Sequence, residues 1–304
     1  MKERPLAHEG ESVSQSDLII IKIERVYRRQ VLFLLYSEFR NFRNYTKAMI
    51  EKNTNKQEVN DHNPPLEPVR LLAEVRGYKY IFIDLDDTLW DFHANAQAAL
   101  EEIYNNHQLY NHFDSFEHYF NIYAKRNLEL WELYGKGEIT KEFLNFERFS
   151  HPLVQVGAGN IKIAEQIGRE FLDMLPTKTL LIPHAKELLD YLYPKYPLTI
   201  ISNGFIEVQY KKLRSSNLEH YFTHIVLSEG AKALKPDKRI YEYAMQLNDA
   251  TASECLMIGD SYEADIVGAR NAGIDQVWFN PHGNKKKREA TYQIEKLESI
   301  VSLI

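Results

Sequence analysis

The stretch Tyr80-Ile-Phe-Ile-Asp84-Leu-Asp86-Asp-Thr88-Leu-Trp-Asp-Phe92 decides the fold of this 304-residue chain. Its first four residues form a short apolar run rich in Ile and Phe, which is typical of a buried central strand. Asp84, Asp86 and Thr88 come next, on the loop that follows the strand. Open α/β sheets bind ligands in the crevice at the carboxyl ends of their strands, so these side chains are expected to face a site. Carboxylates this close repel each other unless a cation joins them.

The second half of the chain alternates between predicted strands and predicted helices. Strands are expected at residues 198–202, 224–227, 255–258 and 276–279, and helices at 183–193, 206–215, 238–247 and 263–272. Strands separated by helices of about ten residues predict right-handed βαβ units and a parallel sheet covered on both faces. The expected fold class is therefore α/β, with a Rossmann-like parallel sheet.

The pattern divides the chain into three zones. Residues 77–93 and 181–304 are expected to form the α/β core domain, and residues 94–180 an inserted helical cap domain, because the latter lack strand-like alternation. Within the insert, Glu117–Tyr134 has helical spacing, and Thr140 opens a further helix after two glycines. Residues 1–76 are expected to be an N-terminal extension, partly helical or disordered.

The extension carries a local excess of positive charge. Residues 18–56 contain nine Lys and Arg against three Asp and Glu. A solvated or weakly docked helix explains this pattern most simply, while a protein that binds a partner through this basic segment is the non-enzymatic alternative.

Composition excludes several classes of protein. The chain is 44% hydrophobic and 26% charged with a formal net charge of −6, so neither a nucleic acid polymer nor a membrane surface is an expected partner. No stretch reaches about 18 uninterrupted apolar residues. The single cysteine, Cys255, lies in an apolar run and fits a small core residue in a reducing compartment. We therefore expect a cytoplasmic protein.

Polar residues also end three later elements of the predicted sheet. Ser202-Asn203-Gly204 follows one strand, and Gly259-Asp260-Ser261 follows another, with Asp265 shortly after. Lys235 precedes a proline, which favours an extended backbone. Taken singly, these motifs are also explained by helix caps, turns or a solvated lysine. Taken in order, each at a strand end of one parallel sheet, they predict a single shared pocket.

The chemistry of that pocket favours magnesium and phosphate. Asp84, Asp86, Asp260 and Asp265 are hard oxygen ligands, which suit Mg²⁺ better than zinc. Lys235, Ser202 and Asn203 suit phosphate oxygens. A carboxylate there can attack phosphorus to form an aspartyl-phosphate, and a second carboxyl can protonate the leaving oxygen and then activate water.

Across about residues 78–304 the chain resembles the haloacid dehalogenase-like (HAD) hydrolases. The four matching motifs are Asp84-Leu-Asp86-Asp-Thr88, Ser202-Asn203, Lys235-Pro236, and Gly259-Asp260-Ser261 with Asp265. The insert resembles the C1 cap of that family. The resemblance implies that Asp84 is nucleophile and metal ligand, that Asp86 is acid/base and binds metal through its backbone carbonyl, and that Asp260 completes the protein ligands. It further implies that Asp265 supports the metal's water shell and Lys235, while Ser202, Asn203 and Lys235 hold the phosphoryl group.

Finer features resemble the pyrimidine 5′-nucleotidase branch. They are Trp131-x-x-Tyr134, Gly137-x-Ile139-Thr140, Arg148-Phe149 and Ser202-Asn203-Gly204-Phe205. They imply a small phosphorylated substrate, a pyrimidine nucleoside 5′-monophosphate. The alternatives are a phosphatase that acts on another small phosphometabolite and a sugar phosphate mutase. A 2-haloacid dehalogenase is a further alternative, but the second acid and the Asp260/Asp265 pair argue against it.

Two further features bear on the pocket. Trp90, Phe92 and Phe205 could stack on a base, although ordinary packing explains each of them more simply. Members of the family commonly have glycine where this chain has Lys232. If that position needs a positive φ, the lysine costs about 1 kcal/mol unless Gly230 takes the turn instead.

Overall fold

The computed structural model describes residues 77–283 and 289–304. Its centre is a six-stranded parallel sheet in the order β3-β2-β1-β4-β5-β6, which confirms the predicted fold class. In that order the strands are His224–Leu227, Leu198–Ser202, Tyr80–Ile83, Cys255–Gly259, Asp275–Phe279 and Tyr292–Ile294. The apolar run at the start of the chain's key stretch is thus the central strand β1, between β2 and β4.

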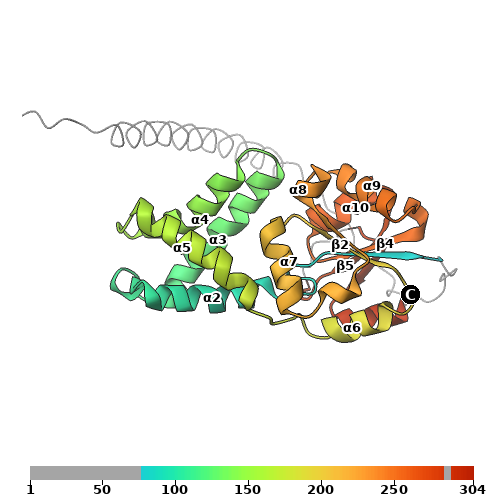
Figure 1. The fold of residues 1–304 in the computed structure, drawn as a ribbon, viewed down its shortest axis with the longest axis horizontal. Helices are drawn as coiled ribbons and strands as arrows, with labels where there is room; N and C mark the ends of the chain where they lie inside the picture. The colour runs from blue at the N-terminus through green and yellow to red at the C-terminus, as the bar shows by residue number, and fades with distance from the viewer. Residues whose placement is uncertain (1–76, 284–288) are drawn as a thin grey trace, which may run out of the picture. The chain divides into compact units, whose positions relative to one another are not determined.

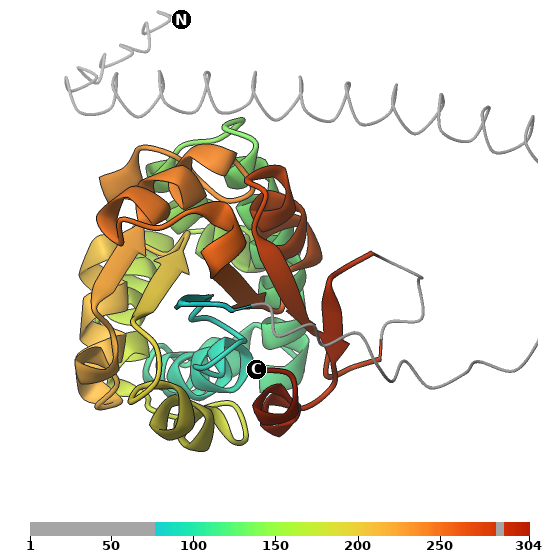
Figure 2. The same cartoon turned by 90° about the vertical axis from the view of Figure 1, so that its right-hand side faces the viewer.

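Side chains alternate between the two faces of the sheet because successive strand residues point in opposite directions. On β1, Ile81 and Ile83 belong to the larger apolar core, whereas Phe82 belongs to a second cluster on the other face. Helices α9 (Lys238–Leu247) and α10 (Gly268–Asn271) contribute to the second cluster. Helix α6 (Ala185–Leu192) and the C-terminal 3₁₀ turn Leu297–Ser302 contribute to the first. Figure 2 shows helices on both sides of the sheet.

Four of the helices between β1 and β2 pack against one another and form the insert (Figure 1). They are α2 (Phe92–Asn106), α3 (Phe116–Gly135), α4 (Lys141–Gln155) and α5 (Ile161–Met174). Each begins with a side-chain oxygen that accepts a backbone N–H, which satisfies one of the otherwise unpaired donors of a helix start. The capping residues are Asp91, Ser115, Thr140 and Asn160.

The chain enters and leaves this helical insert at adjacent points. Asn95 Nδ2 donates to the Leu180 carbonyl at 2.8 Å, and the Leu180 N–H donates to Asn95 Oδ1 at 3.0 Å. One buried amide therefore ties the first helix of the insert to the segment that returns to the sheet. We therefore propose that the cap domain begins near residue 94 and ends near residue 180.

The predicted strands after residue 183 are all present, but the structure differs from prediction at β6 and at residues 263–272. The three-residue β6 was not predicted, because so short a run has no readable period. The predicted helix 263–272 is instead a π-helical turn, Tyr262–Val267, followed by α10. The Tyr241 hydroxyl donates to the Ala264 carbonyl at 2.7 Å, which helps to stabilise the widened turn that carries Asp265.

Lys232 itself takes the left-handed conformation that its position requires. Its φ is 52°, at the end of the short helix α8 (Ser228–Ala231), and Gly230 does not have a positive φ. Gly230 therefore does not absorb the turn, and the expected strain falls on the lysine.

Cys255 is fully buried, and burial raises the pKa of its thiol to about 12, as expected for an inert core residue. Within the part of the chain that the structure describes, no helix is long and apolar enough to cross a membrane. The predictions for residues 1–76 lie outside the described residues.

Candidate active site

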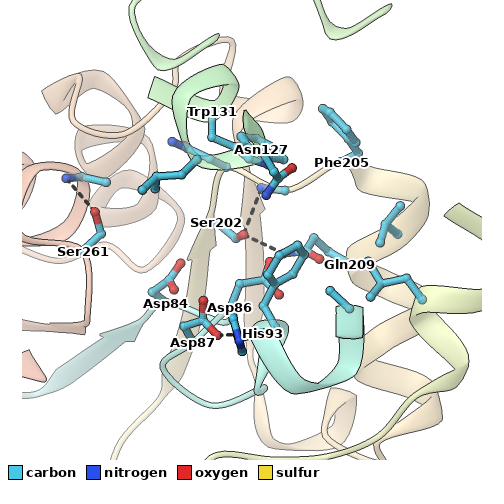
Figure 3. A pocket seen from close by; sticks show the side chains of 18 of the residues that line it. Asp84, Asp86, Asp87, His93, Asn127, Trp131, Ser202, Phe205, Gln209 and Ser261 are labelled. Carbon is cyan, nitrogen blue, oxygen red and sulfur yellow. Dashed lines mark hydrogen bonds between the residues drawn. The ribbon is translucent and has the colours of Figure 1, made fainter. Parts of the chain in front are cut away.

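The carboxyl ends of the sheet and the helical insert enclose a cavity of about 550 Å³, a size typical of small-molecule sites. Figure 3 shows it from close by, with Asp84, Asp86 and Ser202 turned toward it. Every site residue predicted from the sequence lines this one cavity: Asp84, Asp86, Ser202, Asn203, Lys235, Asp260 and Asp265.

Lys235 is the central cation of the site. Its Nζ lies 2.5 Å from Asp84 Oδ1 and 2.7 Å from Asp265 Oδ1, and it also donates to the Ile201 carbonyl at 2.8 Å. Burial opposes its charge, but the two carboxylates outweigh that effect and raise the pKa of Lys235 above its ordinary value. Lys235 is therefore a fixed positive charge beside the predicted nucleophile.

Asn203 holds the backbone on which Lys235 sits. Its Nδ2 donates to the Lys235 carbonyl at 2.9 Å, and its Oδ1 accepts the Lys235 N–H at 2.7 Å. The Asn203 amide, predicted to contact phosphate, thus uses one N–H donor and its oxygen acceptor to position the loop that carries Lys235.

Asp84, Asp260 and Asp265 form a compact acidic cluster. One carboxylate oxygen from each lies within 4.8 Å of the other two. Burial raises the pKa of Asp84 to about 7 although Lys235 lowers it, and burial together with Asp84 raises the pKa of Asp260 well above its ordinary value.

Three carboxylates and the charge of Lys235 sum to −2 when all are ionised (−3 + 1), which a divalent cation would neutralise. The cluster contains only oxygen donors, which is the chemistry that Mg²⁺ prefers. These residues therefore fit a magnesium ion.

Thr88, fully buried next to the cavity, orients Asp260. Its hydroxyl donates to Asp260 Oδ1 at 2.9 Å and accepts the Asp260 N–H at 3.1 Å. The threonine of the first motif thus fixes a carboxylate from the fourth motif, more than 170 residues later in the chain.

The Asp86 carboxylate is not part of the acidic cluster and makes a second set of contacts. Lys212 Nζ donates to its Oδ1 at 2.6 Å, and Gln209 Nε2 donates to its Oδ2 at 2.8 Å. Gln209 Nε2 also donates to Ser202 Oγ at 2.7 Å, and the Gly204 N–H donates to the same oxygen at 3.1 Å. Since Ser202 accepts both bonds, its own hydroxyl proton remains available for a ligand oxygen.

Lys212 and Gln209 were missed from the sequence. Both lie on α7 (Ile206–Ser215), three residues apart, where a helix places them on one face. A lysine in a basic helix normally indicates a solvated surface, yet Lys212 is only 2% exposed. Its ammonium lies 4.4 Å from the Trp90 ring centroid and 5.3 Å from that of Phe92, so both rings face the cation.

The three aromatic residues that were considered as base-stacking candidates differ in their surroundings. Trp90 is fully buried and donates through Nε1 to the Ser216 hydroxyl at 3.1 Å, so it is a packing residue, as the simpler interpretation held. Phe92 and Phe205 do line the cavity, together with Trp131, whose ring lies 5.3 Å from that of Phe205. His93, beside Asp87, is a further lining residue that the sequence did not indicate.

Comparison with known proteins shows which family shares these motifs. A profile of haloacid dehalogenase-like hydrolases matches residues 78–273. YfnB of Bacillus subtilis, named as a HAD-hydrolase, is 32% identical over 76% of this chain and 97% of its own length. The chain belongs to the haloacid dehalogenase-like hydrolase family.

Other relatives of this HAD hydrolase have more specific names. The pyrimidine 5′-nucleotidase PynA of Streptococcus pneumoniae is 31% identical, with 75% of this chain and 95% of PynA aligned. The pyrimidine 5′-nucleotidase YjjG of Escherichia coli is 28% identical over 75% of this chain and 98% of its own length.

A crystal structure of YfnB bound to magnesium, described as revealing interdomain movement, superposes on this HAD hydrolase. Its TM-score is 0.68 at 30% identity, and it covers 74% of this chain and 98% of YfnB. A magnesium-bound relative with this fold agrees with the fit of the acidic cluster to that ion.

Proposed function

We propose that this HAD hydrolase is a magnesium-dependent phosphatase that acts through an aspartyl-phosphate on Asp84, with pyrimidine nucleoside 5′-monophosphates as substrates. The observation that carries the proposal is that Asp84 contacts Lys235 and lies beside the Asp260 and Asp265 carboxylates, in one cavity. A nucleophilic carboxylate in that environment lies next to the fixed ammonium of Lys235 and next to the residues that would hold a magnesium ion.

Asp84, Asp260 and the backbone carbonyl of Asp86 would hold the ion, with Asp265 fixing Lys235. Magnesium, when bound, offsets negative charge on the phosphoryl group and lets an anionic nucleophile approach it. Lys235 adds a positive charge on the same side, and the free hydroxyl proton of Ser202 can donate to a phosphoryl oxygen.

The bond changes follow from these positions. An Asp84 oxygen forms a bond to phosphorus while the ester P–O bond breaks, and Asp86 gives a proton to the departing alkoxide. Water then attacks phosphorus and passes its proton to Asp86, the P–O bond to Asp84 breaks, and inorganic phosphate leaves. Asp86 thus ends the cycle in the protonation state in which it began.

The substrate class rests on the relatives and on the cavity lining. Both PynA and YjjG are named as pyrimidine 5′-nucleotidases, and the chain covers nearly their whole length. The cavity is large enough for a small molecule and is lined by Phe92, Trp131 and Phe205, whose rings suit a planar base.

Phosphate release from UMP and dUMP tests the proposal. Asp84→Asn is expected to abolish turnover, and EDTA is expected to silence the wild type until magnesium is restored. Asp190→Asn, at an exposed position of α6, is the matched control and is expected to keep full activity. Full turnover by Asp84→Asn would overturn the proposal.

Single turnover in heavy-oxygen water identifies the atom that water attacks. The aspartyl-phosphate route puts the label in released phosphate and none in Asp84. Label in the Asp84 carboxyl, together with halide release from a 2-haloacid without magnesium, would assign the chain to carbon–halogen hydrolysis instead.

A further inference from the structure

Arg148 is a buried cation on the cap side of the cavity that phosphoryl chemistry does not use. It lies on α4, lines the cavity and is only 2% exposed. Its Nη2 donates to Asn145 Oδ1 at 2.5 Å, but its Nε has no hydrogen-bond partner among the described residues. Within residues 77–283 and 289–304, Arg148 forms no salt bridge with a carboxylate.

A guanidinium in this position is costly unless something binds it. A buried charge normally requires an ionic or hydrogen-bonded partner. Phe149 and Phe171 face it, with ring centroids 5.0 and 5.2 Å from Cζ, and stabilise the charge without accepting its N–H groups. Burial lowers the pKa of Arg148 from its ordinary value, partly offset by Tyr123.

The neighbouring face of α3 presents two more buried polar atoms without partners. Tyr123 and Asn127 are one turn apart, both line the cavity, and neither Tyr123 Oη nor Asn127 Oδ1 has a hydrogen-bond partner among the described residues. Tyr123 lies close enough to Arg148 for the guanidinium to lower its pKa, which burial raises to about 12, but the contact lacks hydrogen-bond geometry. Buried polar atoms without partners carry a desolvation cost, which a ligand bound in the cavity would remove by hydrogen-bonding to them.

We propose that Arg148 recognises the part of the substrate remote from the phosphate by donating to a carbonyl oxygen on a planar ring, while the unpaired Asn127 Oδ1 accepts an N–H of the same ring. Arginine has donors only, so its partner must be an acceptor. The aromatic lining contributed by Phe92, Phe120, Trp131 and Phe205 favours a ring over a flexible chain. This assignment rests on the proposed phosphatase function and adds the residue that selects the substrate.

The experiment compares three phosphomonoesters in the full-length enzyme with magnesium. UMP has ring carbonyls, phenyl phosphate has a ring without a polar acceptor, and ribose 5-phosphate has no ring base. Arg148→Met should lower kcat/KM for UMP by about 10- to 100-fold, the effect of removing a charged hydrogen bond. It should change kcat/KM for the other two esters by less than about threefold, because they make no such bond.

Two further variants control for structure. Arg126→Met removes another arginine of the insert, one that pairs with Glu129 and Glu147 and does not line the cavity, and should leave all three substrates unchanged. Arg148→Lys keeps the charge but loses the planar fork, so it should recover only part of the UMP activity. Equal losses on all three substrates by Arg148→Met would overturn the proposal.

The wild type supplies a test that no folding defect can obscure. It should prefer UMP to ribose 5-phosphate by at least about tenfold in kcat/KM, the effect of one charged hydrogen bond. Equal values overturn the recognition proposal while leaving the phosphatase proposal intact, and no phosphate release from any ester overturns the latter. If Arg148→Met lowered kcat/KM for a bisphosphate more than for UMP, the partner of Arg148 would be an anion and not a carbonyl oxygen. That result would also overturn the recognition proposal.

Discussion

Lys212 Nζ lies 2.6 Å from Oδ1 of Asp86, in an ion pair whose lysine side chain is only 3% exposed. The lysine comes from α7, after β2, and the aspartate from the loop after β1. The pair therefore connects the segments that follow two neighbouring strands of the sheet. Together with Gln209 it occupies both oxygens of the proposed general acid. The contact therefore fixes where that carboxyl sits relative to Asp84.

We expect Lys212→Met to impair turnover most when the leaving group needs a proton. General acid catalysis contributes about 10²- to 10⁴-fold, so a displaced Asp86 should lower kcat for UMP by at least about tenfold. The nitrophenolate of p-nitrophenyl phosphate leaves without help, so its kcat should change much less. Lys211→Met, the exposed neighbour that contacts Asp173, is the control. Equal effects on both esters would assign Lys212 to packing alone.

The stability of the metal-free protein should fall as pH rises through the range of about 4 to 7. Burial raises the pKa of Asp84 to about 7 and that of Asp87 to about 6, both above the ordinary value for aspartate. The folded state then binds more protons than the unfolded state, and ionisation destabilises it.

Thermal unfolding measures this effect. The Tm of the wild type in EDTA, relative to Asp84→Asn, should fall between pH 5 and pH 8. Because magnesium would bind the ionised carboxylates, it should raise Tm more at pH 8 than at pH 5. A magnesium effect that is larger at pH 5 would contradict the assignment of the acidic cluster.

Gly259→Ala should disable the site without unfolding the sheet. A Cβ at this position would overlap the Asp265 carboxyl group, which would have to shift and take its contact with Lys235 with it. We expect a loss of kcat of at least about tenfold, as is typical when a catalytic group is misplaced. Gly230→Ala is the control, since its Cβ would meet nothing within 4 Å. Unchanged kcat in Gly259→Ala would show that Asp265 need not be fixed.

Lys232→Gly should stabilise the protein modestly. Its φ of 52° costs a non-glycine residue about 1–2 kcal/mol, part of which the greater freedom of glycine in the unfolded chain cancels. The free energy of unfolding should rise by about 0.5 kcal/mol in denaturant titration. Lys232→Ala keeps the Cβ and should not show the gain, and a gain of equal size in both variants would refute the strain.

The strands and the site motifs could be predicted because both depend on local pattern. The apolar runs of β1, β2 and β4 are short and bounded, and each polar motif directly follows its strand. The π-helical turn around Asp265 could not be predicted, since it depends on Tyr241 from another helix. For Trp90, the apolar sequence around it did not distinguish a stacking role from burial.

By itself the sequence determined that Asp84, Asp86, Lys235, Asp260 and Asp265 meet at one edge of a parallel sheet, because strand ends of such a sheet converge whatever lies between them. Only the tertiary structure decided the surroundings of these residues. Lys212 is buried against Trp90, and Arg148 lacks a carboxylate partner in the described part of the chain, because helices packed over the cavity exclude water from side chains that a sequence alone would place at the surface.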